Sequence, residues 1–118
     1  MMRAYFDAVE NNATNAPITD DQTVPVGTDL AFNVLADVDA GFPKGAIVVV
    51  EVNGPGVVGR WDVRTDNGTP LVVGTGKKYL RVYQQLKAAG DWYFTAKLMT
   101  HQGGDFGTQT EFEVHVSG

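Results

Sequence analysis

Apolar and polar residues alternate with a period of two in several short runs of this chain. The runs 30–34, 92–98 and 112–116 each carry an apolar side chain at every second position. Successive side chains of an extended strand point to opposite faces, so each run predicts a strand with one buried and one wet face. The residues predicted to be buried are Leu30, Phe32, Val34, Trp92, Phe94, Leu98, Phe112, Val114 and Val116.

Turn signals divide the rest of the chain into further short strands. Asn53-Gly54-Pro55-Gly56 and Asp66-Asn67-Gly68-Thr69 are rich in residues that supply positive φ angles in tight hairpins. Strands are predicted at 46–52, 57–64, 71–74 and 79–86, and no run has the spacing of a helix. We therefore expect an all-β fold, an antiparallel β-sandwich of about seven strands whose apolar faces stack together.

The chain of 118 residues has room for one domain. Residues 11–23 are mostly polar turn formers, which predicts an N-terminal arm at 1–21 and a sandwich at 22–118. Tyr5, Phe6 and Val9 do not alternate cleanly, so we expect them to bind a partner by adding a strand to a sheet edge. The alternative is that residues 4–9 form the first strand of this domain's own sandwich.

Composition removes several classes of function. The chain contains no cysteine, which excludes disulfides and thiolate metal sites and favours folding in a reducing cytoplasm. The net charge is −5 and the nine basic residues are scattered, so nucleic acid is not an expected partner. No run is apolar enough to span a bilayer, and residues 1–10 do not read as a signal peptide.

The segment from Leu86 through Gly90-Asp91 to Trp92, followed by the alternating strand that ends at Val116, resembles the closing half of immunoglobulin-like domains. Trp92 stands where those domains often have a tyrosine that makes a corner hydrogen bond, and an indole can only donate. Small acidic immunoglobulin-like domains without cysteine are similar in type to accessory proteins of tailed-phage virions. The resemblance implies a virion protein made in the host cytoplasm, with a capsid or tail protein as its partner.

Catalytic and metal-binding patterns are weak. Ser117 is the single serine, so a Ser-His-Asp triad with His101 or His115 is not expected. The Asp37/Asp39 turn has too few oxygen ligands for a calcium loop. We therefore expect no enzyme activity, no cofactor and no metal site, and we place His115 on a solvated strand face.

The resulting hypothesis is a non-catalytic structural or interaction protein that decorates or cements a capsid or tail surface, with self-association open as a further possibility. The expected partner-binding residues are Tyr5, Phe6, Val9 and Phe106, the last in a glycine-rich loop. A carbohydrate-binding or adhesion module is the alternative, because outward aromatics such as Tyr93 and either Tyr79 or Tyr83 can stack on sugars.

Overall fold

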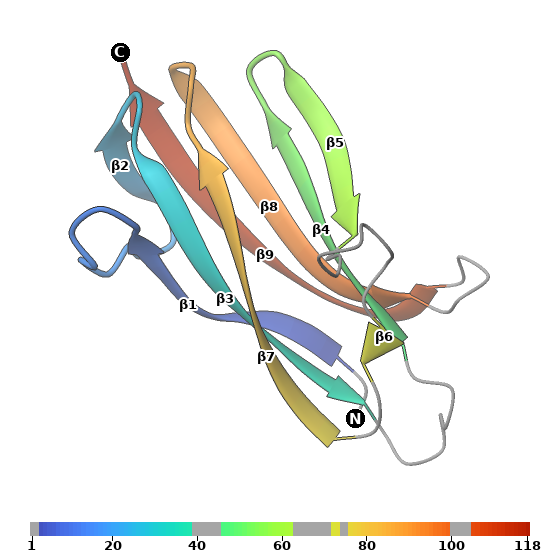
Figure 1. Ribbon diagram of the computed structural model, residues 1–118. Coiled ribbons are helices and arrows are strands. Elements are labelled where there is room, and N and C mark those ends of the chain that lie inside the picture. Colours follow the sequence, from blue (N-terminus) through green and yellow to red (C-terminus); the bar gives the residue numbers. More distant parts are fainter. Residues whose placement is uncertain (1–2, 39–45, 63–71, 74–75, 100–104) are drawn as a thin grey trace.

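The computed structural model describes residues 3–38, 46–62, 72–73, 76–99 and 105–118, and within these ranges all regular structure is strand (Figure 1). Seven strands have six residues or more, and β2 and β6 are shorter. The strands are β1 (Arg3–Asn11), β2 (Gln22–Pro25), β3 (Asp29–Val38), β4 (Ala46–Gly54), β5 (Val57–Asp62), β6 (Val72–Val73), β7 (Gly76–Gln85), β8 (Gly90–Met99) and β9 (Asp105–Ser117). No helix of the described ranges could cross a membrane.

The strands form two sheets that face one another (Figure 1). One has three strands in the order β1-β3-β7, and the other has the order β2-β9-β8-β4-β5 with β6 beside β4. The β-sandwich predicted from the alternation, of the immunoglobulin-like type that the resemblance implies, is therefore confirmed. One pairing departs from the antiparallel expectation, because β2 runs parallel to β9.

The core lies between the two sheets and contains the predicted residues. Trp92, Phe94 and Leu98 of β8 are completely buried, as are the alternating apolar residues of β3. Phe112 is the exception, since it is only half-buried and packs against the margin of the core. The two sheets thus bury the faces that the sequence pattern assigns to the interior.

Aromatic rings dominate the middle of this core. The ring centroid of Phe32 lies 4.7 Å from that of Phe94 and 5.1 Å from that of Phe6, so the three rings connect the two sheets. The indole N–H of Trp92 donates to the carbonyl oxygen of Ala88 at 3.0 Å. This hydrogen bond links β8 to the turn that precedes it. The indole N–H donates at the position where the tyrosine of immunoglobulin-like domains donates its hydroxyl hydrogen.

Strand β1 corrects the predicted N-terminal arm. Residues 3–11 pair antiparallel with β3, with a bulge between Phe6 and Ala8. The extra residue reverses the alternation, so Phe6 and Val9 both point inward although three positions separate them. Residues 3–11 therefore belong to the sandwich and not to a separate arm, and the structure supports the alternative prediction that residues 4–9 form its first strand.

Candidate functional site

The outer face of the three-stranded sheet carries tyrosines at matched positions. Tyr5 on β1 and Tyr79 on β7 lie on either side of Leu35 in the middle strand. Tyr83 lies four residues further along β7, so it points to the same side as Tyr79. Tyr79 and Tyr83 are 62% and 52% exposed, whereas Leu35 beneath the row is buried.

Two arginines accompany these rings. The guanidinium of Arg3 lies 4.4 Å from the ring centroid of Tyr5, and that of Arg81 lies 5.7 Å from the ring centroid of Tyr83. Arg81 also pairs with Glu10 at 2.7 Å and donates to the Oδ1 of Asn33 at 2.8 Å. We call Arg3, Tyr5, Tyr79, Arg81 and Tyr83 the tyrosine face. The ion pair between Arg81 on β7 and Glu10 on β1 holds Arg81 in place on the tyrosine face.

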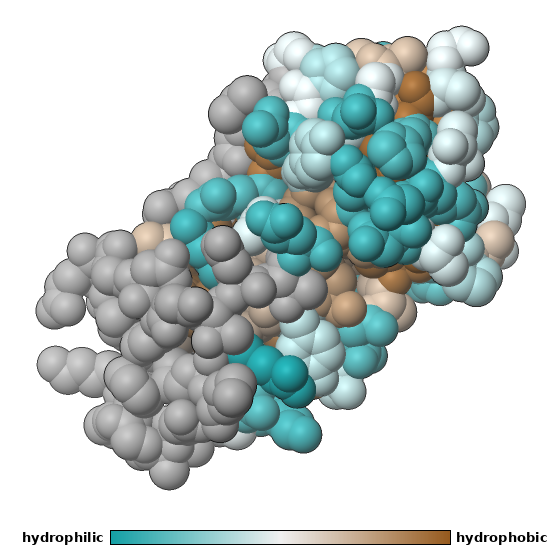
Figure 2. Space-filling model, turned by 180° about the vertical axis from the view of Figure 1, so that it is seen from behind, coloured by the Kyte–Doolittle hydropathy of each residue, from teal (hydrophilic) through white to brown (hydrophobic). Residues whose placement is uncertain are grey.

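A second group of side chains lies on the outer face of the other sheet. Antiparallel pairing of β8 with β9 places Asp91 directly opposite His115 and Tyr93 directly opposite Glu113. The turn before β2 adds Asp21, whose backbone N–H donates to the carbonyl of Glu113 at 2.8 Å. Figure 2 looks onto the molecule from the side opposite to Figure 1 and shows hydrophilic side chains gathered on this described part of the surface.

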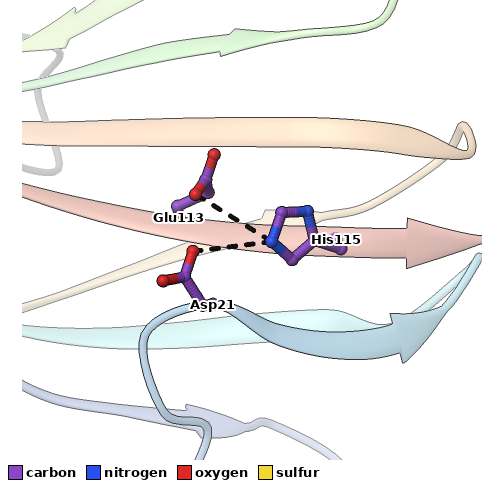
Figure 3. A group of neighbouring side chains, drawn as sticks. All are labelled: Asp21, Glu113 and His115. Atoms are coloured by element: carbon purple, nitrogen blue, oxygen red, sulfur yellow. Dashed lines mark ion pairs between the residues drawn. The ribbon is translucent and has the colours of Figure 1, made fainter.

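His115 is at the centre of this group (Figure 3). Its Nδ1 lies 2.6 Å from the Oδ1 of Asp91, which fixes that nitrogen as the protonated donor when the ring is neutral. Its Nε2 faces the Oδ1 of Asp21 at 3.5 Å and the Oε2 of Glu113 at 3.9 Å. We call Asp21, Glu113 and His115 the His115 cluster, with Asp91 behind it.

Carboxylates determine the electrostatics of the His115 cluster. The carboxylate of Asp91 raises the pKa of His115 through its hydrogen bond to the ring. Hydrogen bonding to the neighbouring carboxyl of Asp21 raises the pKa of Glu113, and the carboxylate of Glu113 in turn raises the pKa of Tyr93 by accepting from its hydroxyl. The cluster therefore holds more negative charge than its own cations neutralise.

The raised pKa of His115 predicts a pH-dependent contribution to folding. A group whose pKa is raised on folding adds stability below its unfolded pKa, here about 6.5, and that stability is lost as the pH rises through the folded pKa. The carboxylates that face the ring are those of Asp21, Asp91 and Glu113. We expect His115→Gln to lower the free energy of unfolding more at about pH 6 than at about pH 9. The protein is treated with a chelator beforehand, so that protonation of the ring is the only event measured. Urea titrations at both values measure this, and an equal or opposite difference would contradict it.

The predicted partner-binding residues Tyr5, Phe6 and Val9 do not share one exposed surface. Val9 is buried, and Phe6 is partly buried and packs against the core, so both side chains point into the domain. Tyr5 is half-exposed and belongs to the tyrosine face. Phe106 lies in β9, but its side chain is outside the described part of the structure, as are residues 39 and 101.

Sequence reasoning missed the His115 cluster. The pattern placed His115 on an outward strand position beside Glu113, which is correct, and interpreted it as simply solvated. Asp21 lies far from both in sequence and comes close only because β2 runs parallel to β9. The sequence signal that could have pointed to the cluster is the pair Asp20-Asp21 just before a strand. In the structure, Asp21 has a φ of 67°, and Asp20 accepts a hydrogen bond from the backbone N–H of Glu113 at 2.8 Å.

Comparison with known proteins gives limited results. No family model and no curated protein matches the chain. Among solved structures, the solution NMR structure of the CARDB domain of PF1109 from Pyrococcus furiosus has a TM-score of 0.48 and 16% identity, covering 98% of this chain and 97% of that chain. A crystal structure of that CARDB domain with di-metal ions has a TM-score of 0.42 and 15% identity, covering 83% of this chain and 84% of that chain. These similarities assign no function to the chain.

Proposed function

We propose that the chain is a non-catalytic binding domain and that the tyrosine face is the surface with which it docks on another protein. The observation that carries the proposal is the exposure of Tyr79 and Tyr83 beside an arginine held in place by Glu10 and Asn33. Tyrosine and arginine are enriched at protein interfaces, where they contribute most of the binding energy. Side chains already fixed by their neighbours lose less conformational entropy on binding.

The more specific form of this proposal is a virion accessory protein that docks on a capsid or tail surface. It rests on the resemblance in composition and fold type, since the chain is small, acidic and free of cysteine. The correction to β1 changes how such docking would occur. Attachment would use the face of the folded sheet, because β1 is a strand of the domain's own sheet and Phe6 and Val9 point into its interior, which leaves Tyr5 on the outer face.

Carbohydrate binding is the second candidate, and the observation that favours it is the pair of exposed tyrosines on β7. Sugar rings stack on aromatic faces that are free. Arg3 and Arg81 lie over the rings of Tyr5 and Tyr83, so Tyr79 is the one described tyrosine of this face with no guanidinium over its ring. A protein partner therefore fits this surface better than an extended glycan.

Site-specific crosslinking tests the proposal. We expect a photoreactive phenylalanine at position 79 or 83 to crosslink to the same single protein in the cells that produce the chain. Position 93 is the matched control, because Tyr93 is also an exposed tyrosine (46%) but lies on the opposite sheet. Excess wild-type protein should compete for the crosslink, and the double variant Tyr79→Ala/Tyr83→Ala should compete at least about 30-fold less well.

Three results would count against this docking surface. Equal crosslinking at positions 79 and 93 would mean that the tyrosine face is not special. Undiminished competition by the double variant would mean that the two rings do not contribute to binding. Selective binding to a glycan array that Tyr79→Ala removes, without a protein crosslink, would support the carbohydrate alternative in its place.

A further inference from the structure

The His115 cluster brings together three electron-pair donors with no positive charge between them in the neutral-ring state. With Nδ1 donating to Asp91, the Nε2 of neutral His115 presents a lone pair to the carboxylates of Asp21 and Glu113. All three ligand atoms lie within 4.8 Å of one another. Such an arrangement is repulsive unless a proton or a metal ion is held at its centre.

The spacing of these atoms suits a metal ion of zinc size. Ligand atoms about 2.0–2.2 Å from a tetrahedral zinc ion lie roughly 3.3–3.6 Å apart. The distances from the Nε2 of His115 to the two carboxylates are 3.5 Å and 3.9 Å, so small side-chain rotations would complete the geometry. Asp21 and His115 are 66% and 37% exposed in their side chains, which leaves space for an ion and water to enter.

The backbone and the second layer of side chains already orient the ligands. A metal-binding histidine usually donates its other ring N–H to a carboxylate, and Asp91 makes that contact at 2.6 Å. The backbone N–H of Glu113 donates to the Oδ1 of Asp20, and its carbonyl oxygen accepts from the backbone N–H of Asp21, both at 2.8 Å. The ligands from β9 and from the turn are therefore held in register before any ion arrives.

We propose that Asp21, Glu113 and His115 form a binding site for a divalent transition-metal ion, with Zn²⁺ as the ion that the mixed imidazole and carboxylate ligands suit best. Three protein ligands leave at least one coordination position for water or for a group from a partner. Because Asp21 immediately precedes β2, the ion would tie the start of this short edge strand to β9.

Zinc titration of the full chain tests this proposal. We expect calorimetry with ZnCl₂ to give one site per chain, with MgCl₂ binding at least about 10-fold more weakly because magnesium prefers an all-oxygen shell. His115→Gln and Asp21→Asn should each remove the zinc site. Asp91→Asn should weaken zinc binding about 10–100-fold, and ¹⁵N shifts should show that the ring of His115 no longer favours the Nδ1–H form. Amide exchange of residues 22–24 should slow when zinc is bound.

Matched variants separate a coordination site from general attraction to negative charge. Glu111→Gln removes one carboxylate from the same exposed face of β9, two residues from Glu113, and should leave zinc affinity within about 2-fold. His101→Ala should also leave it unchanged. The proposal is overturned if zinc does not bind, if binding survives His115→Gln and Asp21→Asn in variants with wild-type circular dichroism, or if Glu111→Gln lowers the affinity as much as these variants do.

Discussion

Replacing Phe94 by alanine is expected to lower the free energy of unfolding by about 3–5 kcal/mol. Phe94 is completely buried, and its ring lies 4.7 Å from that of Phe32 on the opposite sheet and 6.4 Å from that of Trp92. Removing the ring leaves a cavity at the centre of the contact between the sheets, and close-packed neighbours refill such a cavity only in part. Urea-induced unfolding followed by tryptophan fluorescence measures the change.

The matched control for this substitution is the neighbouring residue on β8. Tyr93 points outward and is 46% exposed, so Tyr93→Ala is expected to cost less than about 1 kcal/mol. The comparison tests the register of the strand, because a shift of one residue would exchange the two effects. A larger loss at position 93 than at position 94 would mean that the assigned faces of β8 are wrong.

Deleting residues 1–21 is expected to abolish cooperative unfolding of the isolated domain. The deletion removes β1, exposes one edge of β3 and takes away the inward side chains Ala4, Phe6 and Val9. Burial of a large apolar side chain contributes about 1.5–3 kcal/mol, and a domain of this size is stable by only about 5–15 kcal/mol. Near-ultraviolet circular dichroism and a thermal scan check the result.

Two further measurements make this expectation specific to β1. A synthetic peptide of residues 1–21, added to the shortened chain, should restore a cooperative transition by returning the missing strand to the edge of β3. The variant Tyr5→Ala should leave stability nearly unchanged, since that side chain lies on the outer face. An unchanged melting temperature after the deletion would restore the interpretation of residues 1–21 as an independent arm.

Much of the fold could be predicted from the alternation of apolar residues. The period of two identified the inward faces of β3 and β8 because both strands are regular across those runs. The turn at 53–56 was also correctly placed between β4 and β5. Regular strands with one wet face are the case in which local pattern and tertiary burial agree.

The pattern failed where pairing is irregular. The bulge in β1 shifts Phe6 and Val9 into the same face, so a strand was interpreted as an arm. The parallel pairing of β2 with β9 could not be inferred from four residues that contain a proline. Both errors arise because pairing partners far apart in sequence decide the outcome, and local spacing contains no information about them.

The tyrosine face and the His115 cluster differ in how much of each could be predicted from the sequence. Only one of Tyr79 and Tyr83 was expected to point outward, whereas both lie on the outer face of β7. The alternation also could not show that Tyr5 would join them across β3. The His115 cluster needed three separate segments to meet, of which only Glu113 and His115 share a strand. A cluster of side chains from segments far apart in the sequence can be identified only when the register of the sheet is known.

The bulge at Asp7 also constrains how this strand can change during evolution. Side chains of a strand alternate between its two faces, so one extra residue shifts this alternation by one position. Even-numbered residues point inward before the bulge, and odd-numbered residues point inward after it. Exchanging Asp7 for another residue preserves that offset, whereas losing the position would turn Ala4 and Phe6 outward and bring Tyr5 into the interior. We therefore expect this point of the chain to tolerate a substitution at Asp7 far better than the deletion of that residue.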